Sequence, residues 1–285
     1  MRAPGASLLA AALLAAAPPA PAFDLGSLDP LKITEIVTKG LKSLQDVPQS
    51  REVEIGRELS AGLLGAQGLV NDPALQAYVN EVGLWLALQT ERPDLPWTFG
   101  VIDTNTVNAF AAPGGYVFVT KGLFLMLRNE AELAGVLGHE ISHVLRRHHL
   151  AALQKQLQLS AAADAASILA ESNRETVDAL VGAGMQLYSK GLDRDDELEA
   201  DRMGVVIAAR GGYDPYGLPA MLLTLNGMSA DNASLAFMFS THPATADRLG
   251  ALDQEMAGRM DRYSGGAVEA DRFRAMQQRL AAANR

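Results

Sequence analysis

The pattern of apolar and polar positions divides the first half of the chain into helical and extended segments. Residues 51–89 show a helical pattern that breaks before Asp72, which can cap a new helix that Pro73 opens. Residues 97–120 are instead rich in β-branched and aromatic side chains and predict three short strands. The Pro-Gly-Gly sequence at 113–115 is typical of a turn between the second and the third strand.

A long helix is expected to follow these strands. Asn129 can cap its start, and Glu132, three residues on, completes a capping box. The apolar positions recur at helical spacing and form one stripe: Leu133, Leu137, Ile141 and Val144. His139 and His143 lie one turn apart, roughly 140° away from the centre of that stripe. The pattern therefore predicts a helix with a core face and a separate histidine face.

Residues 1–22 have the pattern of a secretory signal peptide. Arg2 precedes an apolar run at 8–17, and Ala20-Pro21-Ala22 offers small residues for cleavage. This run is too short to span a bilayer, since a spanning helix needs about 20 apolar residues. We therefore expect export to the periplasm, with secretion as the alternative, and no transmembrane segment in the mature chain.

Charge and cysteine content exclude several classes of function. The 24 basic and 33 acidic residues give a formal net charge of −9, which argues against nucleic acid or an anionic membrane as a partner. The chain has no cysteine, so disulfides, thiolate catalysis and a lipid on cysteine are all excluded.

The stretch GHEISHVLRRHHLA at 138–151 holds four of the five histidines. His139, Glu140 and His143 form an HExxH motif, in which two imidazoles one turn apart can bind zinc beside the glutamate. Zinc lowers the pKa of water, and Glu140 is expected to take the proton as that water attacks a carbonyl and then to pass it to the leaving amine. The motif predicts a zinc hydrolase with one zinc ion per chain.

The third ligand could come from either of two places, and the first is His149. In the metzincin pattern HExxHxxGxxH it would be the last histidine, but Arg146 stands where that pattern has its turning glycine. A helix that continues through Arg146 would carry His149 about 100° away from the ligand face and His148 closer to the core stripe. This favours a structural or surface position for both histidines.

Glu197 is the second candidate for the third ligand. Glu197 and Asp201 are four residues apart in a segment of helix-forming composition, so they share a face, whereas Glu199 points elsewhere. A carboxylate on a second helix can complete a site of two histidines and one glutamate. Asp201 could then accept the spare N–H of a ligand histidine. The alternative is a solvated acidic face, which is common for such runs.

The sequence resembles the zinc metallopeptidases that include the HtpX heat-shock protease, the CaaX prenyl endopeptidases and the periplasmic HtpX-like proteases. The resemblance covers roughly residues 51–252. It rests on EIGRELSAGLL at 54–64, NDPALQAYVNEVG at 71–83, VNAFAAPGGYVFVTKGL at 107–123, NEAELAGVLGHEISHVLRRH at 129–148, ELEADRMG at 197–204, GGYDP at 211–215 and STHPATADRL at 240–249.

The resemblance implies a predominantly helical α+β gluzincin fold with an HExxH helix and a small antiparallel sheet. It implies His139, His143 and Glu197 as zinc ligands and Glu140 as the catalytic glutamate, and it matches Arg147-His148 to an Arg-His pair of the family. HtpX and the CaaX enzymes carry transmembrane helices, whereas none is predicted here after the leader, so the soluble periplasmic branch fits best.

His242 is a further candidate for the site. It precedes Pro243, which suits the first position of a helix, so His242 could simply cap that helix or lie on the surface. The family also carries a histidine-proline pair here, which implies a place at the cleft. There His242 could donate a hydrogen bond to the oxyanion or bind zinc in a resting enzyme. Arg248 is a weaker candidate for the same oxyanion role.

A strand over Val107, Asn108, Ala109 and Phe110 precedes the Pro-Gly-Gly turn. If it forms a sheet edge near the zinc, it could pair with an extended peptide through main-chain hydrogen bonds. An interior strand that serves only the core is the alternative.

These observations predict a zinc-dependent endopeptidase that acts on misfolded or unassembled exported proteins, with envelope proteins as further partners. The alternatives are an envelope chaperone or assembly factor with little proteolysis, and a metzincin that uses His149. The expected organisation is a signal peptide at 1–22, a helical segment at 23–50, the peptidase domain at 51–252 and a helical extension at 253–285. Residues 151–191 could form a lid or pack as helices.

Overall fold

The computed structural model describes residues 47–159, 182, 184, 191–228, 234–242 and 245–283. The expected signal peptide, nearly all of the 23–50 segment and most of the 151–191 connection lie outside these residues. Among the helices that are described, none is long and apolar enough to cross a membrane.

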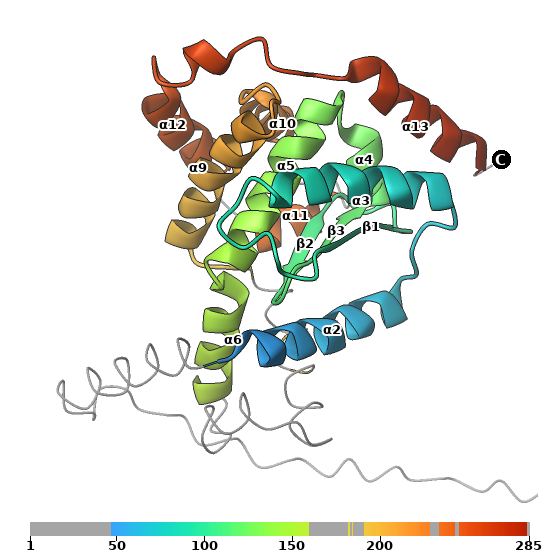
Figure 1. Ribbon diagram of the computed structural model, residues 1–285, viewed down its shortest axis with the longest axis vertical. Coiled ribbons are helices and arrows are strands. Elements are labelled where there is room, and N and C mark those ends of the chain that lie inside the picture. The colour runs from blue at the N-terminus through green and yellow to red at the C-terminus, as the bar shows by residue number, and fades with distance from the viewer. Residues whose placement is uncertain are drawn as a thin grey trace, which may run out of the picture. The chain divides into compact units, whose positions relative to one another are not determined.

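The described chain is mainly helical and has one small sheet (Figure 1), as the predicted α+β class requires. The strands are β1 (Thr98–Ile102), β2 (Ala109–Ala112) and β3 (Tyr116–Thr120). The helices are α2 (Gln49–Ala66), α3 (Pro73–Ala87), α4 (Lys121–Met126), α5 (Glu130–Leu145), α6 (His148–Leu159), α9 (Arg194–Arg210), α10 (Gly217–Asn226), α11 (Ala236–Thr241), α12 (Thr245–Met256), the short 3₁₀ helix η2 (Asp261–Tyr263) and α13 (Ala270–Ala283).

Side-chain caps fix where two of the predicted helices begin. The Asp72 carboxylate accepts hydrogen bonds from the first backbone N–H groups of α3, which opens at Pro73. The Asn129 side chain accepts a hydrogen bond of 2.9 Å from the backbone N–H of Glu132 in α5. Each cap satisfies a donor that the helix itself leaves unpaired.

The sheet is mixed, so the expectation of an antiparallel sheet is wrong for one of its two pairings. The strand order is β1-β3-β2, with β3 antiparallel to β2 and parallel to β1. The predicted turn joins β2 to β3, and Gly114 and Gly115 adopt φ of 77° and 105° there. Residues 103–108 lead from β1 to β2 and leave room between these two strands, which β3 then fills. The strand β2 is therefore an edge strand, and β3 is the central strand.

The sheet separates two apolar cores, because alternate side chains of β2 and β3 point to opposite faces. One face packs with α3 and α5, and the other packs with α2 and α6 (Figure 1). Toward α5 point Ala109, Ala111, Val117 and Val119, and toward α2 point Phe110, Ala112 and Phe118. The strand β2 therefore runs along the helix that carries the HExxH motif.

Close packing of α5 against α9 determines where the acidic residues of α9 lie relative to the histidines of α5. A Cβ atom at Gly138 would come within 2.7 Å of the carbonyl oxygen of Gly204, and one at Gly204 within 2.7 Å of the His139 backbone nitrogen. Real Cβ atoms do not approach so closely, so only glycine allows the two backbones to touch here. This contact brings the acidic first half of α9 against the histidine face of α5.

Candidate metal centre and active site

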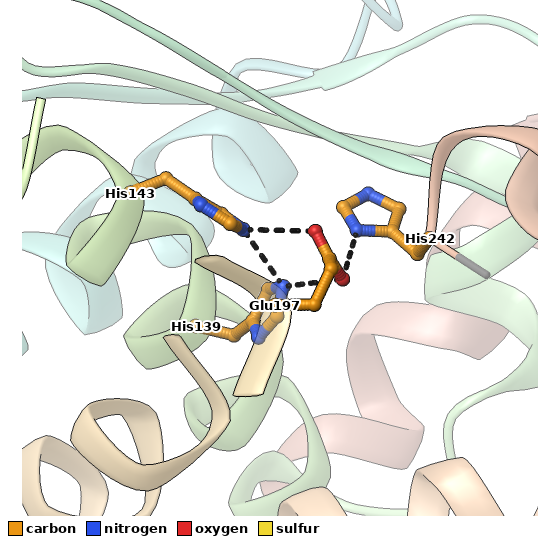
Figure 2. A group of neighbouring side chains, drawn as sticks. All are labelled: His139, His143, Glu197 and His242. Carbon is orange, nitrogen blue, oxygen red and sulfur yellow. Dashed lines mark hydrogen bonds and ion pairs between the residues drawn. The ribbon is translucent and has the colours of Figure 1, made fainter. Parts of the chain in front are cut away.

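Four buried side chains from three helices converge on one point (Figure 2). His139 and His143 come from α5, Glu197 from the first turn of α9, and His242 from the residue after α11. One ligand atom of each lies within 4.8 Å of those of the others. The structure thus brings together the three residues that the sequence suggested as metal ligands and His242, which the sequence suggested for the cleft.

The facing atoms of the three suggested ligands have the spacing of a metal site. The Nε2 atoms of His139 and His143 are 3.0 Å apart, and they lie 3.6 Å and 3.4 Å from the nearer carboxylate oxygens of Glu197. Ligand atoms that each sit about 2.0–2.2 Å from one zinc ion must lie within roughly 4 Å of one another. The three side chains meet this condition.

Two buried oxygens at this point have no hydrogen-bond partner among the described residues. They are Oε2 of Glu140 and Oε1 of Glu197, the latter facing His143 without hydrogen-bond geometry. A buried carboxylate oxygen without a partner is costly, and a cation removes that cost. The donor set of two imidazoles and a carboxylate therefore fits a divalent metal such as zinc.

Asp201 and Arg248 contact the side chains of the cluster and hold them in place. Asp201 Oδ1 lies 2.9 Å from His139 Nδ1, the ring nitrogen that points away from Glu197. Arg248 on α12 donates two hydrogen bonds of 2.7 Å and 2.6 Å to Asp201, and its Nη1 lies 3.1 Å from Glu197 Oε2. Asp201 thus lies where the sequence suggested, whereas the Arg248 guanidinium is engaged with two carboxylates of the site.

Burial and these partners shift the pKa values of several groups in the site, among them His143, Glu140 and Asp201. Burial lowers the pKa of His143 well below its ordinary value, so the ring is neutral near pH 7, as metal ligation requires. Burial raises the pKa of Glu140. Burial also acts to raise the pKa of Asp201, but the Arg248 guanidinium and the His139 ring together outweigh it and lower the pKa to about 2. Asp201 is therefore an ionised acceptor for the His139 ring.

Comparison with known proteins identifies the family of this arrangement. Residues 73–256, which include all the side chains of the cluster, match the model of peptidase family M48. The chain belongs to this family.

Several M48-type relatives are similar to the chain over its central part. A beta-barrel assembly-enhancing protease of Escherichia coli (strain K12) is 32% identical over 210 residues, 69% of this chain and 43% of that protein. Metalloprotease YcaL of the same organism is 35% identical over 57% of this chain and 63% of its own length. The mitochondrial metalloendopeptidase OMA1 of Schizosaccharomyces pombe is 27% identical over 62% of this chain and 52% of its own length. The chain thus spans somewhat less than half the length of the Escherichia coli beta-barrel assembly-enhancing protease.

The HExxH helix of this M48 chain ends earlier than expected. It ends at Leu145, and Arg147 adopts a φ of 56° before α6 begins at His148. The expectation that the helix continues through Arg146 is therefore wrong, because the chain turns at Arg147, one residue after the position of the glycine in the metzincin pattern. His149 nevertheless lies outside the group of ligand atoms, and burial lowers its pKa to about 3.

Two contacts in the M48 site were not predicted from the sequence. The first is the partner of His143, whose Nδ1 lies 2.9 Å from Nδ1 of the buried His148. The second is the contact of His242, which the sequence suggested for the cleft, with the two glutamates: its Nδ1 lies 3.0 Å from Glu197 Oε2, and its Nε2 lies 3.9 Å from Glu140 Oε1. Only the clustering of histidines at 139–149 was a signal for the first. Pro243, the expected first residue of the next helix, lies outside the described residues.

The suggested substrate strand lies beside Glu140. Ala109 lines two cavities that Glu140 and His242 also line. The first is mainly apolar, and its walls come largely from α10: Leu218, Met221, Leu222 and Leu225. In the β2–β3 pairing, Thr120 N–H donates to the Asn108 carbonyl, so Asn108 and Phe110 bond to β3. By alternation, the N–H and C=O of Ala109 face away from β3.

We expect Asp201→Asn to weaken zinc binding by about 10–100-fold, the usual effect of changing an outer partner of a ligand histidine. The neutral amide loses its charge interaction with Arg248 and holds the His139 tautomer less firmly. The measurement is the zinc dissociation constant by competition with a chelator. Asp195→Asn, a change at an exposed carboxylate on the same helix, is the control and should leave the constant unchanged. Equal constants for both variants would refute the supporting role of Asp201.

Proposed function

We propose that the chain is a zinc-dependent endopeptidase that cleaves misfolded or unassembled exported proteins. The observation that carries the proposal is the buried group of His139, His143 and Glu197, beside which the Oε2 atom of Glu140 has no hydrogen-bond partner among the described residues. A bound zinc ion would supply Lewis-acid chemistry there, by acidifying water and polarising the scissile carbonyl. Membership of family M48 supports the reaction class.

In this proposal Glu140 is the general base. Its Oε2 is buried and makes no hydrogen bond within the described residues, so that oxygen is available to take a proton from the attacking water. The raised pKa brings the carboxyl closer to neutral pH, so the protonated form that donates to the leaving amine becomes accessible. Asp201 orients the His139 ring, and Arg248 holds the carboxylates of Asp201 and Glu197.

Two further observations support unassembled exported proteins as the substrate class and the periplasm as the location. Residues 1–22 have the pattern of a signal peptide, which supports action on exported proteins. The relative from Escherichia coli is named a beta-barrel assembly-enhancing protease, which supports unassembled envelope proteins as substrates.

Cleavage of one exported β-barrel protein in two states tests this substrate class. Purified chain should cut the denatured, unassembled barrel and casein, and should leave the same barrel intact once it has folded in detergent micelles. A folded barrel cleaved as fast as its unfolded form would contradict the proposed selectivity. Lack of any cleavage, with zinc bound, would favour the alternative of an assembly factor.

We propose that β2 holds extended substrate through main-chain hydrogen bonds of Ala109. Ala109→Pro should raise KM by roughly 2- to 12-fold, the effect of losing one hydrogen bond of about 0.5–1.5 kcal/mol. The β2–β3 ladder should persist, because the Ala109 N–H faces away from β3. Steady-state kinetics on a peptide substrate provide the measurement, with Ala109→Ser as a control that keeps the N–H. Unchanged KM for the proline variant would count against the strand.

We propose that His242 is a fourth metal ligand that holds activity off in the resting state. Its place in the ligand group supports this over an oxyanion donor. His242→Ala should therefore raise basal cleavage of casein. A fall in kcat by about 10²–10³-fold would instead favour the oxyanion donor. Kinetics identical to those of the unaltered chain would dispose of both roles.

A further inference from the structure

The two histidines of the HExxH motif have different outer partners. His139 Nδ1 faces the carboxylate of Asp201 at 2.9 Å, the usual kind of partner for a metal-binding histidine. His143 Nδ1 faces no carboxylate but the imidazole of His148, with 2.9 Å between the two Nδ1 atoms. Both rings are buried, and their planes meet at 69°.

Hydrogen-bond chemistry assigns a direction to this contact. A neutral His143 that offers its Nε2 lone pair to a cation carries its proton on Nδ1. That N–H can donate to His148 Nδ1 only if His148 keeps its own proton on Nε2. His148 Nε2 lies 3.3 Å from Glu199 Oε2 and 3.6 Å from Asp196 Oδ1, so its N–H has an acceptor in the carboxylates of α9.

An unusual backbone turn puts His148 in this position. Arg147 has a φ of 56°, a conformation that non-glycine residues rarely adopt and that needs support from surrounding contacts. The support is an ion pair of 2.8 Å between Arg147 Nη2 and the fully buried carboxylate of Glu52 on α2. Arg92 also holds Glu52 with two hydrogen bonds. An uninterrupted helix would have carried His148 away from His143.

We propose that His148 is a positioning residue for the metal centre. It accepts the Nδ1 hydrogen bond of His143, fixes the tautomer that exposes Nε2 to the metal, and is itself aimed by the left-handed turn at Arg147. The inference rests on the proposed metal site, and it assigns to the Arg147-His148 pair a role toward the metal rather than toward the substrate.

The zinc dissociation constant and the visible absorption of the cobalt-substituted protein test this role. His148→Leu should weaken zinc binding by about 10–100-fold and shift the cobalt bands, because His143 loses its acceptor. His148→Asn should restore both, since the Asn Oδ1 atom can stand where Nδ1 stands. His149→Leu, a change at the adjacent histidine outside the ligand group, is the matched control and should leave both unchanged.

A second pair of variants tests the backbone turn at Arg147 separately from the imidazole ring of His148. Arg147→Val, whose β-branched side chain disfavours positive φ, should weaken zinc binding as His148→Leu does. Arg147→Gly, which adopts that φ freely, should stay closer to the unaltered chain although it also lacks the ion pair. Equal losses in the two variants would overturn the role assigned to the turn.

The outcomes distinguish failure of this inference from failure of the proposed function. If the unaltered chain binds no zinc, the proposed metal site itself is wrong. If it binds zinc and His148→Leu binds equally tightly with unshifted cobalt bands, only the positioning role of His148 is overturned. Should His148→Leu fail to fold, His148→Asn still decides, because an Asn variant that folds but binds zinc about 10–100-fold more weakly than the unaltered chain contradicts the acceptor role.

Discussion

Replacement of Glu140 by glutamine is expected to lower casein cleavage by roughly 10²–10⁴-fold, the usual contribution of a general base, while zinc remains bound. Glutamine has the size of glutamate but cannot take up a proton. Glu140 is not among the four residues whose possible ligand atoms converge, so the substitution leaves the proposed metal group intact. The measurement combines kcat/KM on casein with zinc content by elemental analysis.

Glu91→Gln is the matched control for this change, because Glu91 is exposed in the loop after α3. It should leave both quantities unchanged. Cleavage by Glu140→Gln at the unaltered rate would contradict the assigned base. Full complementation of a gene deletion by the inactive Glu140→Gln variant would favour the assembly-factor alternative over proteolysis.

Replacement of Glu197 by alanine is expected to weaken zinc binding by more than about 10–100-fold. That range is typical of substitutions at residues that only hydrogen-bond a ligand, such as Asp201. The variant removes one of the proposed ligands and leaves Arg248, which pairs with Glu197, facing the histidines. The zinc dissociation constant is the measurement, and casein cleavage should fall with it.

His149→Ala decides between the two candidates for the third ligand. It should keep its zinc, because His149 lies outside the ligand group, whereas Glu197→Ala should lose it. The opposite result, with zinc lost from His149→Ala and kept by Glu197→Ala, would favour the metzincin alternative.

The features that the sequence predicted well depend on local rules. The caps at Asp72 and Asn129, the apolar stripe of α5 and the Pro-Gly-Gly turn each involve residues within a few positions of one another. Glu197 and Asp201 also share a face of α9, as their spacing indicated, whereas the choice of Glu197 over His149 as third ligand depended on the family resemblance. These elements are present in the structure with the expected bounds or close to them.

The features that the sequence did not predict depend on contacts between distant residues. The parallel pairing of β1 with β3 depends on where the β2–β3 hairpin packs, and no local pattern fixes that. The left-handed turn at Arg147 depends on Glu52, which lies far away in the chain, is buried, and also accepts a hydrogen bond from Gly114 of the β2–β3 turn. The burial of His242 against Glu197 likewise depends on how α11 packs.

The central claim is that one zinc ion, held by His139, His143 and Glu197, makes this M48 chain a peptidase. The most direct test removes the metal from the purified chain with a chelator, dialyses the chelator away, and adds zinc back in steps while casein cleavage is followed. The account predicts that cleavage disappears with the metal and returns in full at one zinc ion per chain. Undiminished cleavage by the metal-free chain would contradict it.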